Sequence, residues 1–293
     1  CHFVAASRNA TAWYCAMARA HCQPDIWRMK LNERVKITRN AHVAEVMLNR
    51  PEKFNALDMQ MFEALGAAAD TLARQADLRA VILYGAGDNF CAGIDVGVFA
   101  DPSVRIDQEL MRPIDGSRAN LFQRAAYAWR ELPVPVICAL HGVTYGGGLQ
   151  IALGADLRYA AADSRFSIME TKWGLIPDMS ISTTLRHIVS ADKIKELAWS
   201  AKVFDANEAE QLGVVTGVHA DPLDAARKFA DDCAARSPGA IRGIKTLVNE
   251  AWSLSEDESL ALEAKLQLGI MGSPNQIEAV RANLEGRKPE FAD

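Results

Sequence analysis

The chain has 293 residues, enough for one large domain or two small ones, with 32 Lys and Arg against 37 Asp and Glu and a formal net charge of -5. This mildly acidic balance argues against nucleic-acid binding, which usually depends on a basic surface. The six cysteines include no CxxC spacing and the six histidines are dispersed, so we expect neither a disulfide framework nor a metal site. No apolar run approaches the roughly 18 residues of a membrane span, so we expect no membrane segment.

Residues 1–28 form an N-terminal extension that we leave unassigned. They contain three arginines and one acid, Asp25, a composition compatible with targeting to the mitochondrial or another organelle matrix. The chain begins with Cys1, however, which favours a fragment or a misassigned start upstream of Met29. We therefore expect a cytoplasmic protein, with organelle targeting as the alternative.

Strand and helix patterns alternate in the first half of the chain. Residues 34–50 contain two short strand patterns, VKIT and HVAEVML, separated by a turn at Asn40. Apolar residues at helical spacing then run from Asp58, a candidate N-cap, to Ala76. The apolar run Leu78–Gly85 predicts another strand, and the order strand, helix, strand implies a right-handed crossover with parallel pairing.

The alternation continues through the middle of the chain. A long helical segment is predicted over residues 104–131, followed by a buried strand that ends at Gly142. A helix is then expected to start at a run of three glycines and to continue through LQIALGADL. Residues 165–170 predict the next strand, and Pro177 with Asp178 is expected to open another helix.

Beyond about residue 205 the pattern is mostly helical. The predicted helices start near Asp205, Pro222, Pro238, Ser255 and Pro274. Repeated strand and helix units followed by a helical tail predict an α/β fold. We place its core in residues 29–220 and a C-terminal helical region in residues 221–293.

Two glycine-containing segments follow predicted strands: FCAGID, residues 90–95, and HGVTYGGGLQ, residues 141–150. Gly146, Gly147 and Gly148 would open a helix and leave unpaired N–H groups at its positive end, where an oxyanion is well stabilised. The alternative is that they only form a tight turn and allow close packing. A dinucleotide fingerprint is not supported, because GAGDNF lacks the third glycine, and no GxxxxGK phosphate loop occurs.

Four segments, in this order, resemble the signatures of the crotonase, or enoyl-CoA hydratase/isomerase, superfamily: NRPEKFNAL, FCAGID, HGVTYGGGLQIALGADLRYA and FSIMETKWGLIPD. The resemblance covers residues 29–293. It implies a spiral core of ββα repeats and a C-terminal helical region, residues 221–293, that mediates assembly into a homotrimer or a dimer of trimers. It also implies an acyl-CoA thioester as substrate and no separate cofactor, because coenzyme A is part of the substrate.

The resemblance assigns a role to two backbone amides. The N–H groups of Ile94 and Gly147 match the family's oxyanion hole, which accepts the thioester carbonyl and stabilises the enolate. Because both donors are main-chain groups, the side chain at position 94 can vary. The substrate-binding positions that the resemblance implies are Ala56, Leu57, Ala92, Gly93, Asp95, Gly146 and Gln150.

The carboxylates indicate which reaction follows enolate formation. Family hydratases carry two glutamates, and this chain matches only the second, Glu170, because the first position is Gln150. Glutamine can hold a water molecule but cannot remove its proton. Asp178, eight residues beyond Glu170, resembles the second acid of dienoyl-CoA isomerases, which have a further Asp where this chain has Gln150. The competing interpretations are a solvated strand-end acid for Glu170 and a helix N-cap for Asp178.

These residues together predict an isomerase that shifts a double bond in an enoyl- or dienoyl-CoA, with Glu170 and Asp178 as the catalytic pair. The alternative is hydration of a 2-enoyl-CoA, with Asp178 in place of the missing glutamate. A third hypothesis is a non-catalytic protein that binds acyl-CoA.

Overall fold

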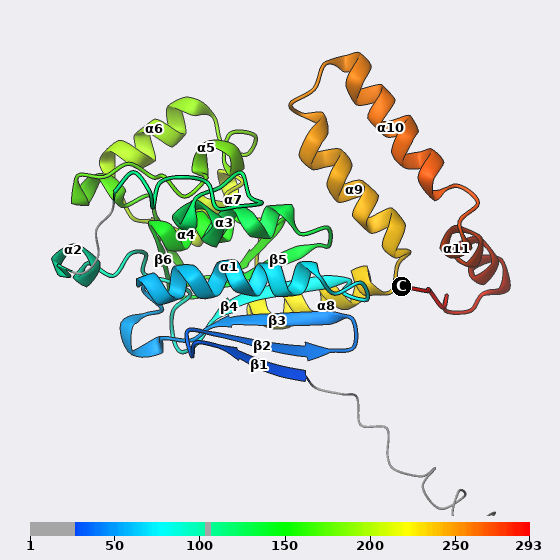
Figure 1. The fold of residues 1–293 in the computed structure, drawn as a ribbon, viewed down its shortest axis with the longest axis horizontal. Helices are drawn as coiled ribbons and strands as arrows, with labels where there is room; N and C mark the ends of the chain where they lie inside the picture. The colour runs from blue at the N-terminus through cyan, green and yellow to red at the C-terminus, as the bar shows by residue number, and fades with distance from the viewer. Residues whose placement is uncertain (1–26, 103–106) are drawn as a thin grey trace, which may run out of the picture.

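The computed structural model describes residues 27–102 and 107–293, and its core is a seven-stranded sheet in the order β1-β2-β3-β4-β5-β7-β10 (Figure 1). β1, β2 and β3 pair antiparallel, whereas the strands from β3 to β10 pair parallel. The strands of this sheet are β1 (Trp27–Leu31), β2 (Val35–Asn40), β3 (Val43–Leu48), β4 (Ala80–Gly85), β5 (Val136–Leu140), β7 (Leu157–Ala160) and β10 (Gly217–Val218). A smaller sheet contains β6 (Val143–Tyr145), β8 (Arg165–Ser167) and β9 (Phe204–Asp205).

Helices cover both faces of the larger sheet. One face carries α1 (Met59–Ala73), α3 (Leu121–Glu131) and α4 (Gly147–Gly154), and the other carries α8 (Pro222–Ala234). Alternate residues of a strand point to opposite faces, so Val81 of β4 packs with the first group and Ile82 packs with α8. The other helices before residue 220 are η1 (Pro51–Lys53), α2 (Gly97–Ala100), η2 (Glu170–Trp173), α5 (Ile181–Thr184), α6 (Ala191–Ser200) and α7 (Ala206–Gln211).

The predicted α/β fold is confirmed, including the hairpin, the crossover helix and the parallel strand that follows it. Asp58 caps α1 as predicted, because its carboxylate accepts a hydrogen bond from the Met61 N–H at 2.9 Å. The sheet also extends beyond the predicted start of the core, since Trp27 and Arg28 pair with β2. The rest of the predicted N-terminal extension lies outside the described residues.

The predicted helix over residues 104–131 is wrong in extent. Residues 103–106 lie outside the described part, and the helix observed in the remainder begins only at Leu121. Asn120 starts it with a capping box in which the Asn120 and Gln123 side chains bond each other's backbone N–H groups. Upstream, Pro113 removes a backbone donor that a continuous helix would use.

The helix predicted to run through LQIALGADL is also shorter than expected. It ends at Gly154, and Leu157–Ala160 forms strand β7, which lies between β5 and the edge strand β10. A Cβ at Gly154 would lie only 2.0 Å from the Ala126 carbonyl oxygen, so glycine allows α4 to contact α3 closely. The sequence pattern did not predict α6 or the short strands β6, β7, β9 and β10.

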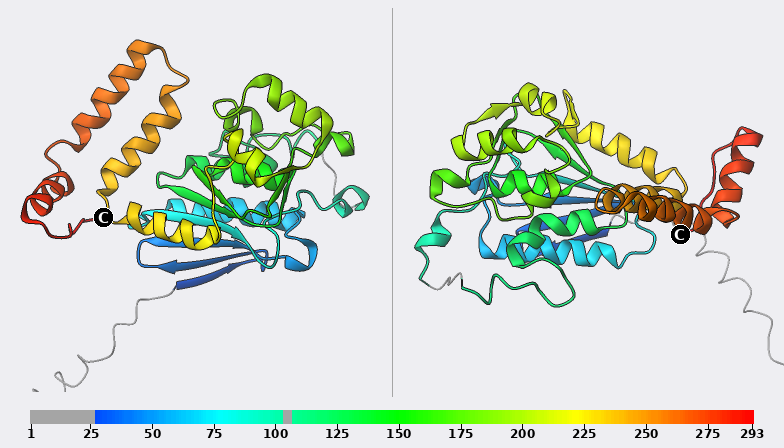
Figure 2. Two further views of the ribbon diagram at one scale, coloured as in Figure 1. Left: turned by 180° about the vertical axis from the view of Figure 1, so that it is seen from behind. Right: turned by 90° about the horizontal axis from the view of Figure 1, so that it is seen from above.

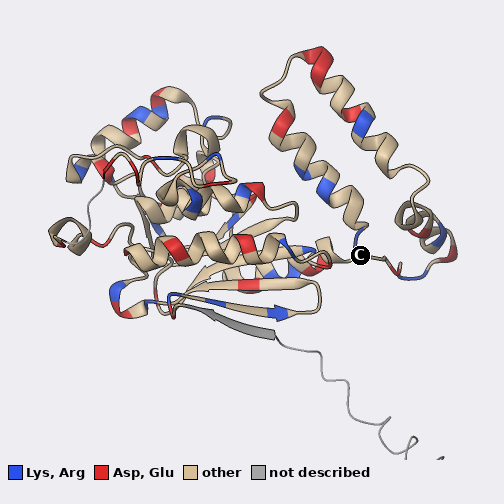
Figure 3. Cartoon of the chain, viewed as in Figure 1, with Lys and Arg blue, Asp and Glu red and all other residues tan. Residues whose placement is uncertain are grey.

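The C-terminal helices begin where the sequence predicted and then leave the core. After α7 and α8 come α9 (Pro238–Ala251), α10 (Glu256–Ile270) and α11 (Pro274–Glu285). Figures 1 and 2 show these last three helices projecting to one side of the α/β core. Figure 3 shows acidic and basic residues interspersed along them, with uncharged residues between. We call α9, α10 and α11 the C-terminal arm.

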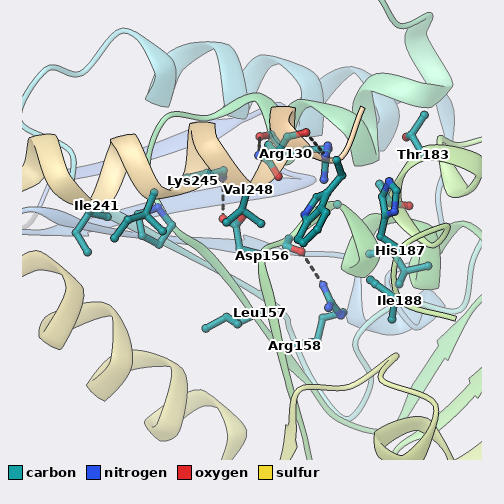
Figure 4. Close-up of a pocket in the computed structure, with 18 of the residues that line it drawn as sticks. Arg130, Asp156, Leu157, Arg158, Thr183, His187, Ile188, Ile241, Lys245 and Val248 are labelled. Atoms are coloured by element: carbon teal, nitrogen blue, oxygen red, sulfur yellow. Dashed lines mark hydrogen bonds and ion pairs between the residues drawn. The ribbon is translucent and has the colours of Figure 1, made fainter. Parts of the chain in front are cut away.

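An ion pair between a buried lysine and a partly exposed aspartate joins α9 to the core. Lys245 of α9 is only 7% exposed, and its Nζ donates to Asp156 Oδ2 at 2.7 Å and to the Val134 carbonyl at 2.9 Å. Figure 4 shows this contact beside a cavity of about 450 Å³ between α9 and the core. Burial lowers the pKa of the Lys245 ammonium, and Asp156 opposes that effect.

Removing Lys245 is therefore expected to destabilise the fold. Lys245→Ala leaves the Asp156 carboxylate without its cation and should lower the free energy of unfolding by about 3 kcal/mol, measured by urea denaturation. Lys265→Ala, on the exposed surface of α10, is the matched control and should change it by less than about 0.5 kcal/mol. Equal small effects of both substitutions would contradict the role given to this ion pair.

Among the described residues, no helix is both long enough and apolar enough to cross a membrane.

Candidate active site

A cavity of about 880 Å³ lies where the segments that follow β3, β4, β6 and β8 meet. Long-range packing of the two sheets brings these segments together from distant parts of the sequence. Ten of the eleven predicted site residues line the cavity: Ala56, Ala92, Gly93, Ile94, Asp95, Gly146, Gly147, Gln150, Glu170 and Asp178. The residues predicted from separate segments of the sequence therefore line a single cavity, which we call the active-site cavity.

Two backbone N–H groups are available in the active-site cavity. The residues on either side of Ile94 bond to Leu57, because the Leu57 N–H donates to the Gly93 carbonyl at 2.8 Å and the Asp95 N–H donates to the Leu57 carbonyl at 2.9 Å. Within the described residues, the N–H groups of Ile94 and Gly147 have no hydrogen-bond acceptor. Gly147 is the first residue of α4, and the N-cap, Gly146, offers no side chain to bond it.

The glycines bring these two amides close together. Gly93 has φ +87°, and a Cβ on it would lie 2.8 Å from the Tyr145 carbonyl oxygen and 3.5 Å from the Gly147 nitrogen. Gly148 has a different function, because a Cβ there would lie 2.5 Å from the Cys91 carbonyl oxygen. Close packing thus explains Gly148, while Gly93 and Gly147 leave two N–H groups beside the same space.

Glu170 is a buried acid beside these amides. Its residue is 9% exposed, and a Cβ on Gly146 would lie 3.5 Å from Glu170 Oε1. β8 ends at Ser167, three residues short of the predicted strand, and Glu170 instead begins the 3-10 helix η2. The interpretation of Glu170 as a solvated strand-end acid is therefore wrong. Burial raises the pKa of its carboxyl group, and the Glu170 Oε2 atom is buried without a hydrogen-bond partner among the described residues.

Asp178 faces the same cavity and is not a helix cap. The next helix begins only at Ile181, and Ser180 before it has φ +72°, so the helix predicted to open at Pro177 and Asp178 is wrong. Although the Asp178 side chain is exposed to solvent in the open cavity, the surrounding protein raises its carboxyl pKa by desolvation. The charge of Asp178 also raises the pKa of Glu170. The charge state of Asp178 therefore affects the protonation of Glu170.

Two of the predicted binding residues, Asp95 and Leu57, make close contacts with other parts of the protein. Asp95 Oδ1 accepts a hydrogen bond from the Gly97 N–H, and Oδ2 forms an ion pair with Arg50 at 2.8 Å; these contacts hold the pKa of the Asp95 carboxyl group below its usual value. Leu57 is fully buried and does not line the cavity. A Cβ on Gly147 would lie 2.8 Å from its Cδ1 atom, so Leu57 packs directly against the first turn of α4.

The apolar wall of the cavity was not predicted from the sequence. It consists largely of Phe62, Phe99, Met111, Phe122, Met169, Trp173, Leu175, Ile176 and Met179. Phe62 of α1 and Phe122 of α3 contact edge to face, with ring centroids 5.0 Å apart. In the sequence Phe62 and Phe122 look like any other core positions of amphipathic helices, so no local pattern marks them as cavity residues.

The chain belongs to the enoyl-CoA hydratase/isomerase family, whose model matches residues 38–293. It is 30% identical to a peroxisomal Delta(3,5)-Delta(2,4)-dienoyl-CoA isomerase of Arabidopsis thaliana over 90% of this chain and 97% of that protein. It is 32% identical to the mitochondrial enzyme of that name from Mus musculus, over 84% of this chain and 77% of the other. Among solved structures, an enoyl-CoA hydratase from Bacillus anthracis superposes with a TM-score of 0.80 at 26% identity, covering 88% of this chain and 98% of the other. The predicted superfamily and its fold are thus confirmed, and the protein is an enzyme of this family.

Proposed function

We propose that this enzyme isomerises double bonds of an acyl-CoA thioester, with a 3,5-dienoyl-CoA as the preferred class of substrate. The observation that carries the proposal is the pairing of two acids of raised pKa, Glu170 and Asp178, in one cavity with two free backbone amides. Similarity to dienoyl-CoA isomerases along most of the chain supports the same assignment.

The two amides would stabilise negative charge on the thioester oxygen. The carbonyl would accept hydrogen bonds from the N–H groups of Ile94 and Gly147 at the positive end of α4. Such a donor typically contributes about 3–4 kcal/mol to stabilising the transition state. The neighbouring carbon then loses a proton more easily, because the electron pair can move onto the oxygen as an enolate.

The two acids would move the proton along the acyl chain. Glu170 borders Gly146, next to the oxyanion donor, and so we assign it as the base that removes a proton from C2. The electron pair spreads over the enolate and the diene, and Asp178 returns a proton at C6. One C–H bond breaks, another forms, and the double bonds move from positions 3 and 5 to positions 2 and 4. No electrons are gained or lost, so the step needs no redox cofactor.

Apolar residues would hold the hydrocarbon part of the substrate. Phe62, Met111, Phe122, Trp173 and Ile176 are among the apolar residues that line the cavity. A mostly apolar wall with a few polar groups is typical of a site for an acyl chain that carries one reacting carbonyl.

Hydration of a 2-enoyl-CoA is the second candidate function, favoured by the similarity to an enoyl-CoA hydratase structure. The distinguishing experiment incubates the enzyme with 2-enoyl, 3-enoyl and 3,5-dienoyl thioesters in deuterated water. We expect a 2,4-dienoyl product with deuterium along the chain and little hydroxyacyl product. Efficient hydration of the 2-enoyl thioester without isomer exchange would overturn the isomerase proposal.

We also propose that the C-terminal arm mediates assembly into a homotrimer or a dimer of trimers. No residue of α10 is buried, and Leu260 and Leu268 are 62% and 79% exposed. Further exposed apolar residues of the arm are Ile244, Val248, Ile277, Val280 and Leu284. An apolar helix surface of this kind needs a partner to exclude water from it.

Light scattering after size exclusion tests the assembly. The intact protein is expected to run at three or six times the chain mass of 32.0 kDa. Leu260→Glu combined with Leu268→Glu should shift it toward the monomer, whereas Glu263→Lys on the same exposed helix should not. A monomeric wild-type protein would overturn the proposal.

A further inference from the structure

Gln150 is a buried polar side chain of the active-site cavity that bonds two other segments of the chain. It lies in α4, three residues after Gly147, and is 1% exposed. Its Nε2 donates to Glu170 Oε1 at 2.6 Å, and its Oε1 accepts from the Met179 N–H at 2.8 Å. These partners are 20 and 29 residues away in the sequence, so one buried amide joins three segments of the chain.

The orientation of the Gln150 amide follows from its partners. The Met179 N–H can only donate, so it must face the amide oxygen, and this leaves the NH2 group toward Glu170. The reverse orientation would place two donors together at Met179 and two acceptors together at Glu170. The ionised form of Glu170 is therefore the form that this contact favours.

We propose that Gln150 is a positioning residue that orients Glu170 for proton transfer and anchors the backbone beside Asp178. The inference rests on the proposed isomerase function. Gln150 bonds Oε1 of Glu170, and Oε2 is buried without a hydrogen-bond partner among the described residues, so the Gln150 amide fixes the orientation of the carboxyl group. Because Met179 directly follows Asp178, the same amide also fixes the segment that carries the second acid.

This geometry also gives Gln150 an electrostatic effect on Glu170. Burial and the charge of Asp178 raise the pKa of Glu170, whereas the N–H of Gln150 lowers it. The other charged residues that line the cavity are Lys53 and Asp95, and Asp95 is paired with Arg50. Loss of the Gln150 donor should therefore make Glu170 harder to ionise and should move the acid limb of the rate profile to higher pH.

Two substitutions of Gln150 test the inference. Gln150→Met keeps the length but removes both hydrogen bonds, and Gln150→Glu keeps an acceptor for the Met179 N–H but brings a second carboxyl group to Glu170. The matched control is Gln123→Glu, which adds the same group to the same cavity and keeps the acceptor that Gln123 offers to the Asn120 N–H. Should Gln150→Met fail to fold, Gln150→Glu carries the test.

The readouts are the pH profile of kcat/KM and the titration of the Glu170 carboxyl carbon by 13C NMR, assigned with Glu170→Gln. In Gln150→Met we expect the Glu170 titration and the acid limb to rise by roughly one pH unit, with turnover ten- to a hundredfold lower. Gln150→Glu should raise the Glu170 titration clearly more than Gln123→Glu does.

An unchanged Glu170 titration in both folded Gln150 variants would overturn the inference. A shift of the Glu170 titration in Gln123→Glu as large as the shift in Gln150→Glu would also overturn it. The NMR titration needs no substrate, so it separates this inference from the proposed function. A shifted titration in an enzyme that converts no dienoyl thioester would leave the contact established and would overturn the isomerase role alone.

Discussion

Glu170→Gln is expected to lower turnover of a 3,5-dienoyl-CoA by roughly two to four decades, the usual range for a lost general acid or base. The substitution keeps the size of the side chain and an oxygen for Gln150 to bond, so it removes little besides proton transfer. Asp178→Asn should have an effect of the same order, measured as kcat with saturating substrate. Asp163→Asn, at an exposed position outside the cavity, is the control and should leave kcat unchanged. Near-normal turnover in Glu170→Gln and Asp178→Asn would contradict the assignment.

Glu170→Gln should also stabilise the folded protein at neutral pH. Burial raises the pKa of Glu170 in the folded protein above its pKa in the unfolded chain. Protonated Glu170 therefore makes its full contribution to stability below the unfolded-state pKa, and this contribution is lost as the pH rises through the folded-state pKa. A neutral Gln does not undergo this loss. The Tm of Glu170→Gln should therefore exceed that of wild type at pH 7, and the difference should shrink near pH 4. An inactive variant with a lower Tm at pH 7 would point to misfolding instead.

Gly147→Pro is expected to lower turnover by at least about a hundredfold, because it removes the N–H that would hold the oxyanion. Proline is compatible with the first position of a helix, so α4 can keep its backbone path. The added atoms meet Leu57 and Met179, since a Cβ at position 147 would lie 2.8 Å from Leu57 Cδ1 and 2.9 Å from Met179 Sδ.

Gly147→Ala separates this contact from the loss of the donor. Alanine adds the same Cβ but keeps the N–H, so its effect on kcat measures the contact alone. We expect the proline variant to be at least about tenfold slower than the alanine variant, with both folded by circular dichroism. Equal turnover in the two would show that the Gly147 N–H does not carry the developing charge.

Local patterns in the sequence determined most of the secondary structure. The Asp58 cap, the apolar run of β4 and the N-terminal residues of the last five helices depend on neighbours a few positions away, and these were predicted correctly. The order of the four motifs also predicted the superfamily, which the comparisons confirmed. The longest error, the helix over residues 104–131, arose where helical periodicity competed with Pro113 and the Asn120 capping box.

The sequence by itself also supplied the residues of the candidate site, but only the tertiary structure decided their environment. The sequence allowed Gln150 to hold a water molecule. In the folded protein its amide nitrogen bonds Glu170 and its amide oxygen bonds Met179 instead. Burial of Glu170 and the late start of α5 beyond Asp178 likewise depend on segments 20 or more residues apart that the packed sheets bring together. Short-range periodicity contains no information on such contacts, because desolvation and hydrogen-bond partners are set by the chain that folds over a residue and not by its neighbours in sequence.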